Sequence, residues 1–267
     1  MLPRVNILRG DHADYLTFST QDTITQVLYL EGSWAGLLQK IGETFCSDVD
    51  APLILDIGAN MGAFAIPIAK NMADRGGLIY AFEPQRIVYY QLCGNVFLNR
   101  LDNIYAFNMA LGNTDTSIEI PAIDYSASQN IGAFSLDLDF RKTLNAVTVK
   151  EGTPRYEVPL QQLDNVSLPK APTLIKIDVE GLEIQVLQGA AQLLKASNFP
   201  PLLLEAWKGE WFKEQREMLI HYLHEIGYTI MCELGEEIIA QNPSHHRRFA
   251  LELNQQTMML SMGKIAG

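Results

Sequence analysis

The stretch DIGANMG, Asp56–Gly62, decides the fold of this 267-residue chain. It follows the apolar run Pro52–Leu55 and precedes the helix-like segment Ala65–Met72, which places it between a buried strand and a helix. Turns of this kind build nucleotide-like ligand sites at the carboxyl ends of strands in α/β proteins. Its glycines permit a positive φ or a close backbone approach, and Asn60 tolerates the left-handed region. The sequence therefore predicts an α/β fold with a ligand site at this turn.

The acid that ends this strand, Asp56, indicates the charge of the ligand. A dinucleotide site carries G-x-G-x-x-G and binds a pyrophosphate at a helix N-terminus, where a carboxylate would repel it. S-adenosylmethionine has a sulfonium and an ammonium group, which suit a nearby acid. An ordinary glycine-rich turn capped by an Asp remains the alternative for so short a motif. We expect S-adenosylmethionine as the cofactor, with four residues around its methionine and ribose: Asp56, Gly58, Asn60 and Gly62.

A second acid, Glu83, ends the next predicted strand, Gly77–Phe82. It lies about 20 residues beyond the first glycine turn, where doubly wound folds place the acid that binds ribose hydroxyls. A solvated strand end is the alternative interpretation. Three more residues are predicted to lie near the cofactor: Asn108 and Ala110 beside the adenine, and Glu31 at the methionine end.

Composition and charge disfavour several classes of function. Hydrophobic residues make up 48% of the chain and charged residues 19%, which is typical of a globular protein. The net charge of −11 disfavours a nucleic-acid partner, since such partners usually need a basic face. No apolar run approaches the roughly 18 residues that span a bilayer, no signal-peptide pattern is present, and the three cysteines are far apart. We expect a cytoplasmic protein that acts on a small-molecule acceptor without membrane contact, in an oligomeric state that stays open.

The first half of the chain is predicted to consist of an extension and an interrupted core. Residues 1–50 form an N-terminal extension packed on a core of residues 51–267, and Val27–Leu30 has the pattern of a short strand. The strand and helix alternation of the core is interrupted by an insert around residues 114–160. Long loops in compact domains are often lids, so residues 121–150 form either a lid or a mobile surface loop.

The second half of the chain returns to strands and helices. The pattern predicts a fourth strand, Thr173–Ile177, one helix over Leu182–Leu194 and a fifth strand, Pro201–Leu204. Two later strand-like segments, Tyr228–Cys232 and Phe249–Leu253, are expected to pair as an antiparallel hairpin that closes the sheet.

Acids also follow the fourth and fifth strands, at Asp178, Glu180 and Glu205. A hydroxyl that receives a methyl group must lose its proton, and clustered carboxylates raise one another's pKa toward that of a useful base. We expect Asp178 or Glu180 to be the base, Glu205 to be the third candidate, and His245 to be an alternative. These acids also suit a divalent cation, but a carboxylate base needs fewer coincidences, so no metal is predicted.

Several motifs occur in an order shared with one known family. They are DIGANMG at Asp56–Gly62, FEP at Phe82–Pro84, IKIDVEGLE at Ile175–Glu183, VLQGA at Val186–Ala190 and the acid-tipped strand Leu203–Glu205. From about Leu28 to Trp207 the chain thus resembles the FkbM family of S-adenosylmethionine-dependent methyltransferases. The resemblance implies a three-layer α/β sandwich with a mostly parallel, seven-stranded Rossmann-like methyltransferase sheet and an antiparallel last strand. It also implies O-methylation of a hydroxyl on a small molecule, sugar or natural product.

Three other functions stay open beside this one. The first is N-methylation or nucleic-acid methylation; amino-group methylation of bases typically uses an (N/D)-P-P-(Y/F) strand end, whereas this chain has DVEG at Asp178–Gly181. A nicotinamide-dependent oxidoreductase would carry the G-x-G-x-x-G motif that is absent from this turn. A non-catalytic ligand-binding module would not need the acids at the ends of the fourth and fifth strands.

Overall fold

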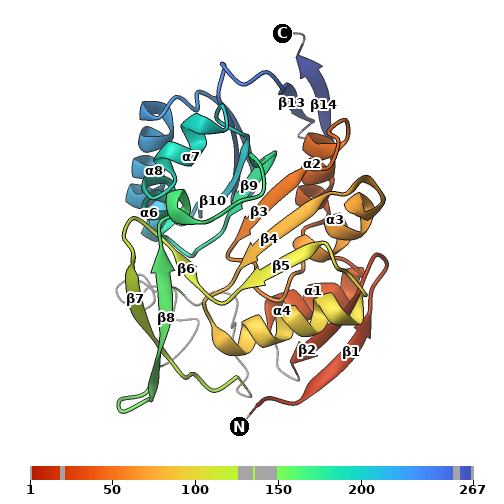
Figure 1. Ribbon diagram of the computed structural model, residues 1–267, viewed down its shortest axis with the longest axis vertical. Helices are drawn as coiled ribbons and strands as arrows, with labels where there is room; N and C mark the ends of the chain where they lie inside the picture. The colour runs from red at the N-terminus through yellow and green to blue at the C-terminus, as the bar shows by residue number, and fades with distance from the viewer. Residues whose placement is uncertain (1, 19–21, 126–134, 136–148, 255–258, 266–267) are drawn as a thin grey trace.

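A mixed sheet of seven strands forms the centre of the described part of the chain (Figure 1). The structure is a computed structural model, and it describes residues 2–18, 22–125, 135, 149–254 and 259–265. Its strands are β3 (Leu53–Ile57), β4 (Leu78–Phe82), β5 (Ile104–Phe107), β9 (Leu174–Ile177), β10 (Leu202–Glu205), β11 (Ile230–Leu234) and β12 (Glu237–Gln241). They lie in the order β11-β12-β10-β9-β3-β4-β5. The neighbours from β10 to β5 are parallel, and β12 is antiparallel to β10 and β11. The predicted sheet and its antiparallel last strand are confirmed.

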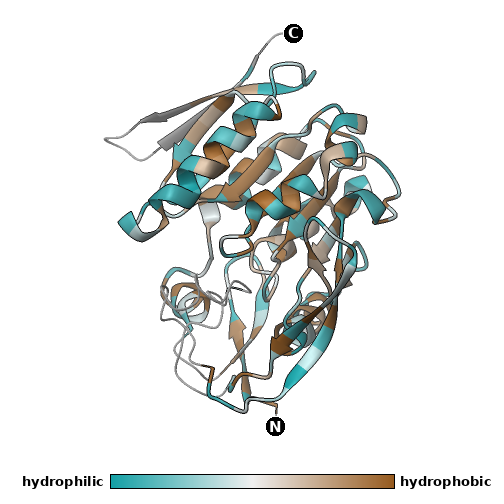
Figure 2. Cartoon of the chain, turned by 90° about the vertical axis from the view of Figure 1, so that its left-hand side faces the viewer, coloured by the Kyte–Doolittle hydropathy of each residue, from teal (hydrophilic) through white to brown (hydrophobic). Residues whose placement is uncertain are grey.

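Helices cover both faces of this sheet and give three layers (Figure 1). One face carries α1 (Thr23–Glu31), α2 (Gly36–Cys46), α3 (Ala65–Met72) and α4 (Arg86–Leu98), and the other carries α6 (Glu183–Gln188), α7 (Ala191–Ala196) and α8 (Lys213–Glu225). Neighbouring strand residues point to opposite faces. Ile54 therefore packs on the face that α1–α4 cover, whereas Leu53 and Leu55 pack on the face that α6–α8 cover. Because strands buried on both faces are mostly apolar, the central strands are largely brown in Figure 2; Asp56 of β3 and Lys176 of β9 are buried exceptions.

The hairpin that closes the sheet differs from the prediction. β11 pairs with β12 through a turn at Gly235, where φ is +61°. Ile238 and Ile239 of β12 are fully buried, because this strand lies inside the sheet between β10 and β11. The predicted partner, Phe249–Leu253, falls in β13 (Arg248–Asn254), which pairs with β14 (Met259–Ile265) in a separate two-stranded sheet. The predicted pairing is therefore wrong.

The predicted strand Val27–Leu30 is also wrong, because this segment belongs to helix α1. The helix has a capping residue at each end: Asp22 accepts a hydrogen bond from the Thr25 N–H at 2.9 Å, and Gly32 ends the helix with φ +72°. An N-cap side chain and a left-handed C-cap glycine fix both helix ends. Those caps outweigh the weak strand propensity of a few β-branched residues.

Side-chain amides of α4 bind the N-terminal hairpin, which consists of β1 (Val5–Arg9) and β2 (Asp14–Phe18). The Leu16 N–H donates to Asn95 Oδ1 at 2.5 Å, and Leu16 O accepts from Gln91 Nε2 at 2.7 Å. Asn99 makes the same pair of bonds with the backbone of Asp14, at 3.0 and 2.7 Å. The spacing of four residues places these amides on one face of the helix. The side-chain amides of α4 thus satisfy backbone N–H and C=O groups of β2 that a neighbouring strand would otherwise bind.

The predicted helix Leu182–Leu194 is interrupted, since α6 ends before Gly189 and α7 begins after it. A Cβ at Gly189 would lie only 1.8 Å from the carbonyl oxygen of Gly112, so the two backbones touch there. The contact joins the segment between α6 and α7 to the residue that follows β6 (Ala110–Leu111). β6 belongs to a three-stranded sheet with β7 (Thr116–Pro121) and β8 (Arg155–Gln161), in the region where the sequence predicts the insert. The remaining elements are the short helices η1 (Ala73–Arg75), η2 (Leu163–Asn165) and η3 (Glu210–Phe212).

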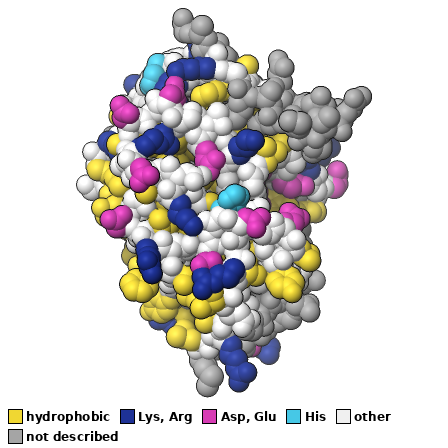
Figure 3. Space-filling view, turned by 90° about the vertical axis from the view of Figure 1, so that its right-hand side faces the viewer, with side chains coloured by type: hydrophobic (Ala, Val, Ile, Leu, Met, Phe, Trp, Pro, Cys, Tyr) yellow, Lys and Arg dark blue, Asp and Glu magenta, His cyan; other side chains and the backbone are white. Residues whose placement is uncertain are grey.

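Most of the candidate lid, at residues 126–134 and 136–148, lies outside the described residues. No helix among the described residues has the length and apolar character needed to cross a bilayer. On the face shown in Figure 3, basic and acidic side chains are interspersed.

Candidate active site

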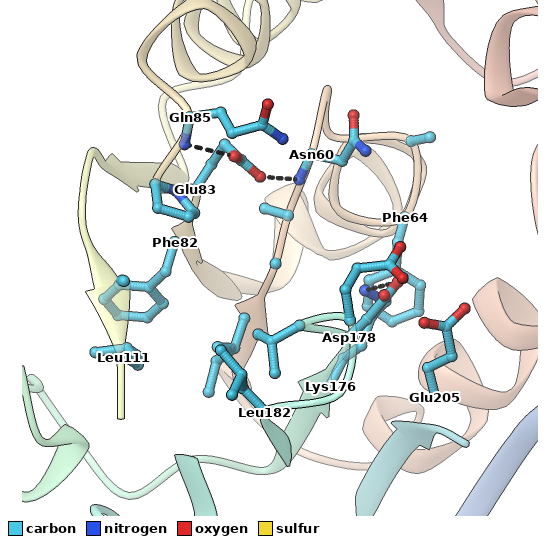
Figure 4. Close-up of a pocket in the computed structure, with 18 of the residues that line it drawn as sticks. Asn60, Phe64, Phe82, Glu83, Gln85, Leu111, Lys176, Asp178, Leu182 and Glu205 are labelled. Atoms are coloured by element: carbon cyan, nitrogen blue, oxygen red, sulfur yellow. Dashed lines mark hydrogen bonds and ion pairs between the residues drawn. The ribbon is translucent and has the colours of Figure 1, made fainter. Parts of the chain in front are cut away.

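A crevice opens at the carboxyl ends of β3, β4, β9 and β10 (Figure 4). Seven of the predicted site residues line it: Gly58, Asn60, Glu83, Ala110, Asp178, Glu180 and Glu205. Trp34, Phe64 and Trp207 add aromatic walls. Because the ends of parallel strands meet at one edge of a sheet, residues separated by more than 100 positions converge here.

The glycines of the DIGANMG turn are required by packing within the protein. Gly58 has φ +79°, and a Cβ there would lie 1.7 Å from the carbonyl oxygen of Asp178. Its N–H donates to Phe82 O at 3.0 Å, so the turn is held against both neighbouring strands. Gly62 has φ +87°, and a Cβ there would lie 2.7 Å from Leu92 of α4. Gly62 does not line the crevice, and its role is to let the turn pack on α4.

The Glu83 carboxylate is fixed at one end of the crevice by two backbone N–H groups (Figure 4). Asn60 donates to Oε2 at 3.0 Å, and Gln85 donates to Oε1 at 2.8 Å. Burial raises the pKa of Glu83 to about 7, although both N–H groups oppose the rise. Asn108 does not line the crevice; its side-chain amide donates to Glu83 O at 2.9 Å and to Pro84 O at 3.0 Å. Asn108 therefore supports the turn that carries Glu83.

Asp56 lies beneath the crevice and does not line it. It is fully buried, and its Oδ1 lies 3.3 Å from Nζ of Lys176, the residue opposite it on β9. The same ammonium donates to Asp178 Oδ2 at 3.0 Å (Figure 4). Burial lowers the pKa of Lys176, but the carboxylates of Asp178 and Asp56 outweigh it and keep the pKa above its ordinary value. Burial raises the pKa of Asp56. Strand alternation directs both side chains toward the face that α1–α4 cover.

Asp178, Glu180 and Glu205 form a cluster of carboxylates at the other end of the crevice. One oxygen of each lies within 4.8 Å of the others. Trp207 Nε1 donates to Glu205 Oε2 at 3.1 Å, whereas the buried Oε2 of Glu180 has no hydrogen-bond partner. Burial raises the pKa of Glu180 and of Glu205 well above the ordinary range, and the nearby charge of Asp178 adds to both shifts. The raised pKa makes the carboxylates of Glu180 and Glu205 stronger proton acceptors than an exposed carboxylate.

Two predicted site residues lie away from the crevice. Glu31 is exposed at the end of α1. His245 follows β12, whose antiparallel course ends beside the amino end of β10. Its Nδ1 lies 2.8 Å from the carbonyl oxygen of Asn198, which precedes β10. His245 is therefore at the edge of the sheet opposite the carboxylate cluster.

A further acid, Glu237, was not predicted as a site residue. It lies opposite Glu205 in the register of β10 and β12. Burial, with added repulsion from Asp178, raises the pKa of Glu237 to about 8. Its sequence signal, an acid before the run Ile238–Ala240, has a meaning only once β12 is recognised as a strand of the main sheet.

Known proteins similar to this chain include methyltransferases. The profile of the family described as Methyltransferase FkbM domain matches residues 56–230. The chain is 23% identical over 231 residues to the methyltransferase sdnD of Sordaria araneosa, a match that covers 75% of this chain and 84% of that protein. It is 29% identical over 107 residues to the tRNA(Phe) (4-demethylwyosine(37)-C(7)) aminocarboxypropyltransferase of Methanocaldococcus jannaschii, which covers 38% of this chain and 40% of that protein.

A solved structure of a methyltransferase FkbM, from Methylobacillus flagellatus KT, superposes with a TM-score of 0.47 and 17% identity. This match covers 72% of the present chain and 44% of the other. The chain thus spans less than half the length of two of these three relatives. The family profile begins at Asp56, the acid of the DIGANMG turn, and extends through both acid-tipped strands. The chain therefore belongs to the FkbM family of S-adenosylmethionine-dependent methyltransferases.

Proposed function

We propose that the crevice transfers the methyl group of S-adenosylmethionine to a hydroxyl oxygen of a small molecule, sugar or natural product. The observation that supports this most is the carboxylate cluster of Asp178, Glu180 and Glu205 beside the DIGANMG turn. A hydroxyl acceptor needs a base, and burial raises the pKa of Glu180 and of Glu205 well above the ordinary value, which makes both carboxylates stronger bases.

The proposed pose of the cofactor follows from the two ends of the crevice. Glu83 keeps acceptor capacity beyond its two backbone bonds and would bind the ribose hydroxyls. Gly58 and Asn60 would line the ribose and methionine, and Ala110 would lie against the adenine. Asp56 would act from below, by holding the ammonium of Lys176 beside Asp178.

The chemistry proposed is an in-line displacement at the methyl carbon. The acceptor oxygen attacks, the carbon–sulfur bond breaks with its electrons moving to sulfur, and the hydroxyl proton passes to a carboxylate. Most of the acceleration should come from holding oxygen, carbon and sulfur nearly collinear. Asp178 or Glu180 is the preferred base and Glu205 the third candidate, since all three lie in one group.

Removing the base should lower turnover without loss of cofactor. We expect Asp178→Asn and Glu180→Gln each to reduce kcat about a hundredfold. This is the lower end of the contribution that general bases make to the rate, because the remaining acids can replace the lost base in part. Affinity for S-adenosylmethionine, measured by calorimetry, should stay within about threefold. Glu210→Gln, a change at a side chain that is 91% exposed, is the control and should keep full turnover. Full turnover in both site variants would rule out the assignment of the base.

The function itself is tested by a screen of alcohols, polyols and sugars with methyl-labelled S-adenosylmethionine. The expected result is a labelled ether product together with the demethylated cofactor. Labelled amines without labelled ethers would instead favour N-methylation. If the protein failed to bind S-adenosylmethionine at all, the proposed function would fall with its cofactor.

Binding of the cofactor should depend on pH through Glu83. Its pKa of about 7 lies above the ordinary value, so the folded protein takes up a proton there as the pH falls. A protonated carboxyl accepts fewer hydrogen bonds from ribose, so the Kd should rise roughly tenfold from about pH 8 to about pH 6. Glu183 and Glu237, with pKa values of about 7 and about 8, titrate in the same interval. The variant Glu83→Gln removes the titration of Glu83 alone and so distinguishes its effect from theirs. This variant should bind weakly at both pH values; a pH dependence equal to that of the wild type would contradict the role of Glu83.

A nucleic-acid acceptor is the second candidate, because one relative is named as a tRNA-modifying enzyme. Nucleic-acid partners usually meet a basic stripe, yet this chain has a net charge of −11. The acidic crevice favours a small or neutral acceptor instead. Transfer of label to bulk tRNA in the same screen would reverse this preference.

A further inference from the structure

The carboxylate cluster has more negative charge than its surroundings balance. Asp178, Glu180 and Glu205 bring oxygens together, and Glu237 lies beside them in the sheet register. Among the described residues, Lys176 is the cation that lines this crevice. Its ammonium is already engaged by Asp56 at 3.3 Å and Asp178 at 3.0 Å. The charges of Glu180 and Glu205 therefore have no cation of their own in the described part of the crevice.

Glu180 supplies a second and independent observation. Its side chain is only 9% exposed, and its Oε2 is buried without a hydrogen-bond partner. A buried polar atom that lacks a partner carries the full cost of its desolvation, so such atoms are rare unless a ligand or water completes them. The same carboxylate of Glu180 contributes an oxygen to the cluster with Asp178 and Glu205.

The spacing of the oxygens fits a hard divalent ion. They lie within 4.8 Å of one another. Two ligands on opposite sides of an ion are separated by twice the metal–oxygen distance, about 4.2 Å for Mg²⁺ and about 4.8 Å for Ca²⁺. All three ligands are carboxylate oxygens, the donors that these ions and Mn²⁺ prefer.

We propose that Asp178, Glu180 and Glu205 bind a divalent cation, with one oxygen from each carboxylate and the unpartnered oxygen of Glu180 within the site. Three protein ligands leave positions open in a coordination shell of six. Two neighbouring oxygens of an acceptor would fill them, which favours a vicinal diol or a hydroxyl beside a carbonyl. In that loaded state the cation would hold the acceptor oxygen, and the hydroxyl proton would pass to a carboxylate oxygen of the cluster that is not a ligand. Only this last role rests on the proposed function; the binding site stands without it.

The test is a titration of the cofactor-free protein with Mn²⁺, followed by the electron spin resonance signal of the free ion. We expect one saturable site per chain, with Mg²⁺ or Ca²⁺ competing for it. Glu180→Gln and Glu205→Gln should each weaken Mn²⁺ binding at least about tenfold, since affinity follows the number of charged ligands. Glu210→Gln, at the exposed start of η3, should bind as the wild type does.

Two more measurements keep the outcome unambiguous. Mn²⁺ should raise the unfolding temperature of the wild-type protein, a readout that needs no variant. Calorimetry with S-adenosylmethionine in chelator-treated buffer tests the cofactor separately, so loss of one site is distinguishable from loss of the other. Absence of saturable Mn²⁺ binding, or equal binding by both site variants and the wild type, would overturn the cation site.

Discussion

Replacing Lys176 with methionine should destabilise the fold by about 3–5 kcal/mol, because it leaves the fully buried carboxylate of Asp56 without its partner. For a chain of this length such a loss lowers the unfolding temperature by roughly 10 °C. Thermal unfolding of the purified protein measures it. The methionine keeps the volume of the lysine stem, so the lost charge, and not a cavity, is responsible.

Lys208→Met is the matched control for this change. Lys208 also pairs with an acid, Glu233, at 3.4 Å, but both side chains are about half exposed. Surface pairs contribute about 0–1 kcal/mol, so this variant should unfold within a few degrees of the wild type. Equal losses from Lys176→Met and Lys208→Met would show that burial of the Asp56–Lys176 pair has no special weight.

The Lys176→Met variant should also recover stability in acid. Burial raises the pKa of Asp56, so the folded state binds that proton more tightly than the unfolded state does. Stability falls as the pH rises through the interval between the two pKa values, and loss of Lys176 widens that interval upward. The destabilisation should therefore be smaller at about pH 5 than at about pH 8. Adding Asp56→Asn should restore part of the stability at the higher pH.

Gly58→Ala should abolish folding to the native state or leave a protein that does not bind S-adenosylmethionine. Its Cβ would lie 1.7 Å from Asp178 O, an overlap with backbone that no side-chain rotation relieves. The φ of +79° adds strain of about 1–2 kcal/mol. Relief requires β3 and β9 to separate, which also moves Asp178 away from the crevice. Yield of soluble protein, circular dichroism and cofactor calorimetry measure the outcome.

Gly235→Ala provides the comparison for positive φ alone. Gly235 has φ +61° in the turn between β11 and β12, and nothing lies within 4 Å of a Cβ built there. This variant should lose only about 1–2 kcal/mol and should keep its cofactor affinity. If Gly58→Ala behaved as mildly as Gly235→Ala, the contact with Asp178 would not control the turn.

The parts of the site that the sequence predicts are those encoded within one strand and the turn after it. Gly58, Glu83 and Asp178 each directly follow an apolar strand, and parallel strands end at one edge of a sheet. Their convergence in one crevice is therefore predictable without coordinates. Lys176 and Asp178, two residues apart on an extended chain, likewise point the same way.

The remainder depends on pairings between distant segments, which local patterns do not encode. The sequence predicts that Asp56 contacts the cofactor, but the register of β3 against β9 places it opposite Lys176. The residue type alone makes His245 a candidate base, but the antiparallel course of β12 carries it to the opposite edge of the sheet. Glu237 enters the site for the same reason, through its register with Glu205.

The amides of α4 that bind β2 also determine where this protein can be cut. Asn95 is fully buried, donates to Met61 O at 2.9 Å within the DIGANMG turn, and accepts from Leu16. A shortened chain that begins at residue 51 would remove Leu16, and Gln91 would lose its backbone acceptor. It would also remove Trp34 from the crevice wall. The first fifty residues belong in any minimal unit chosen for expression or engineering, since they complete the walls of the crevice.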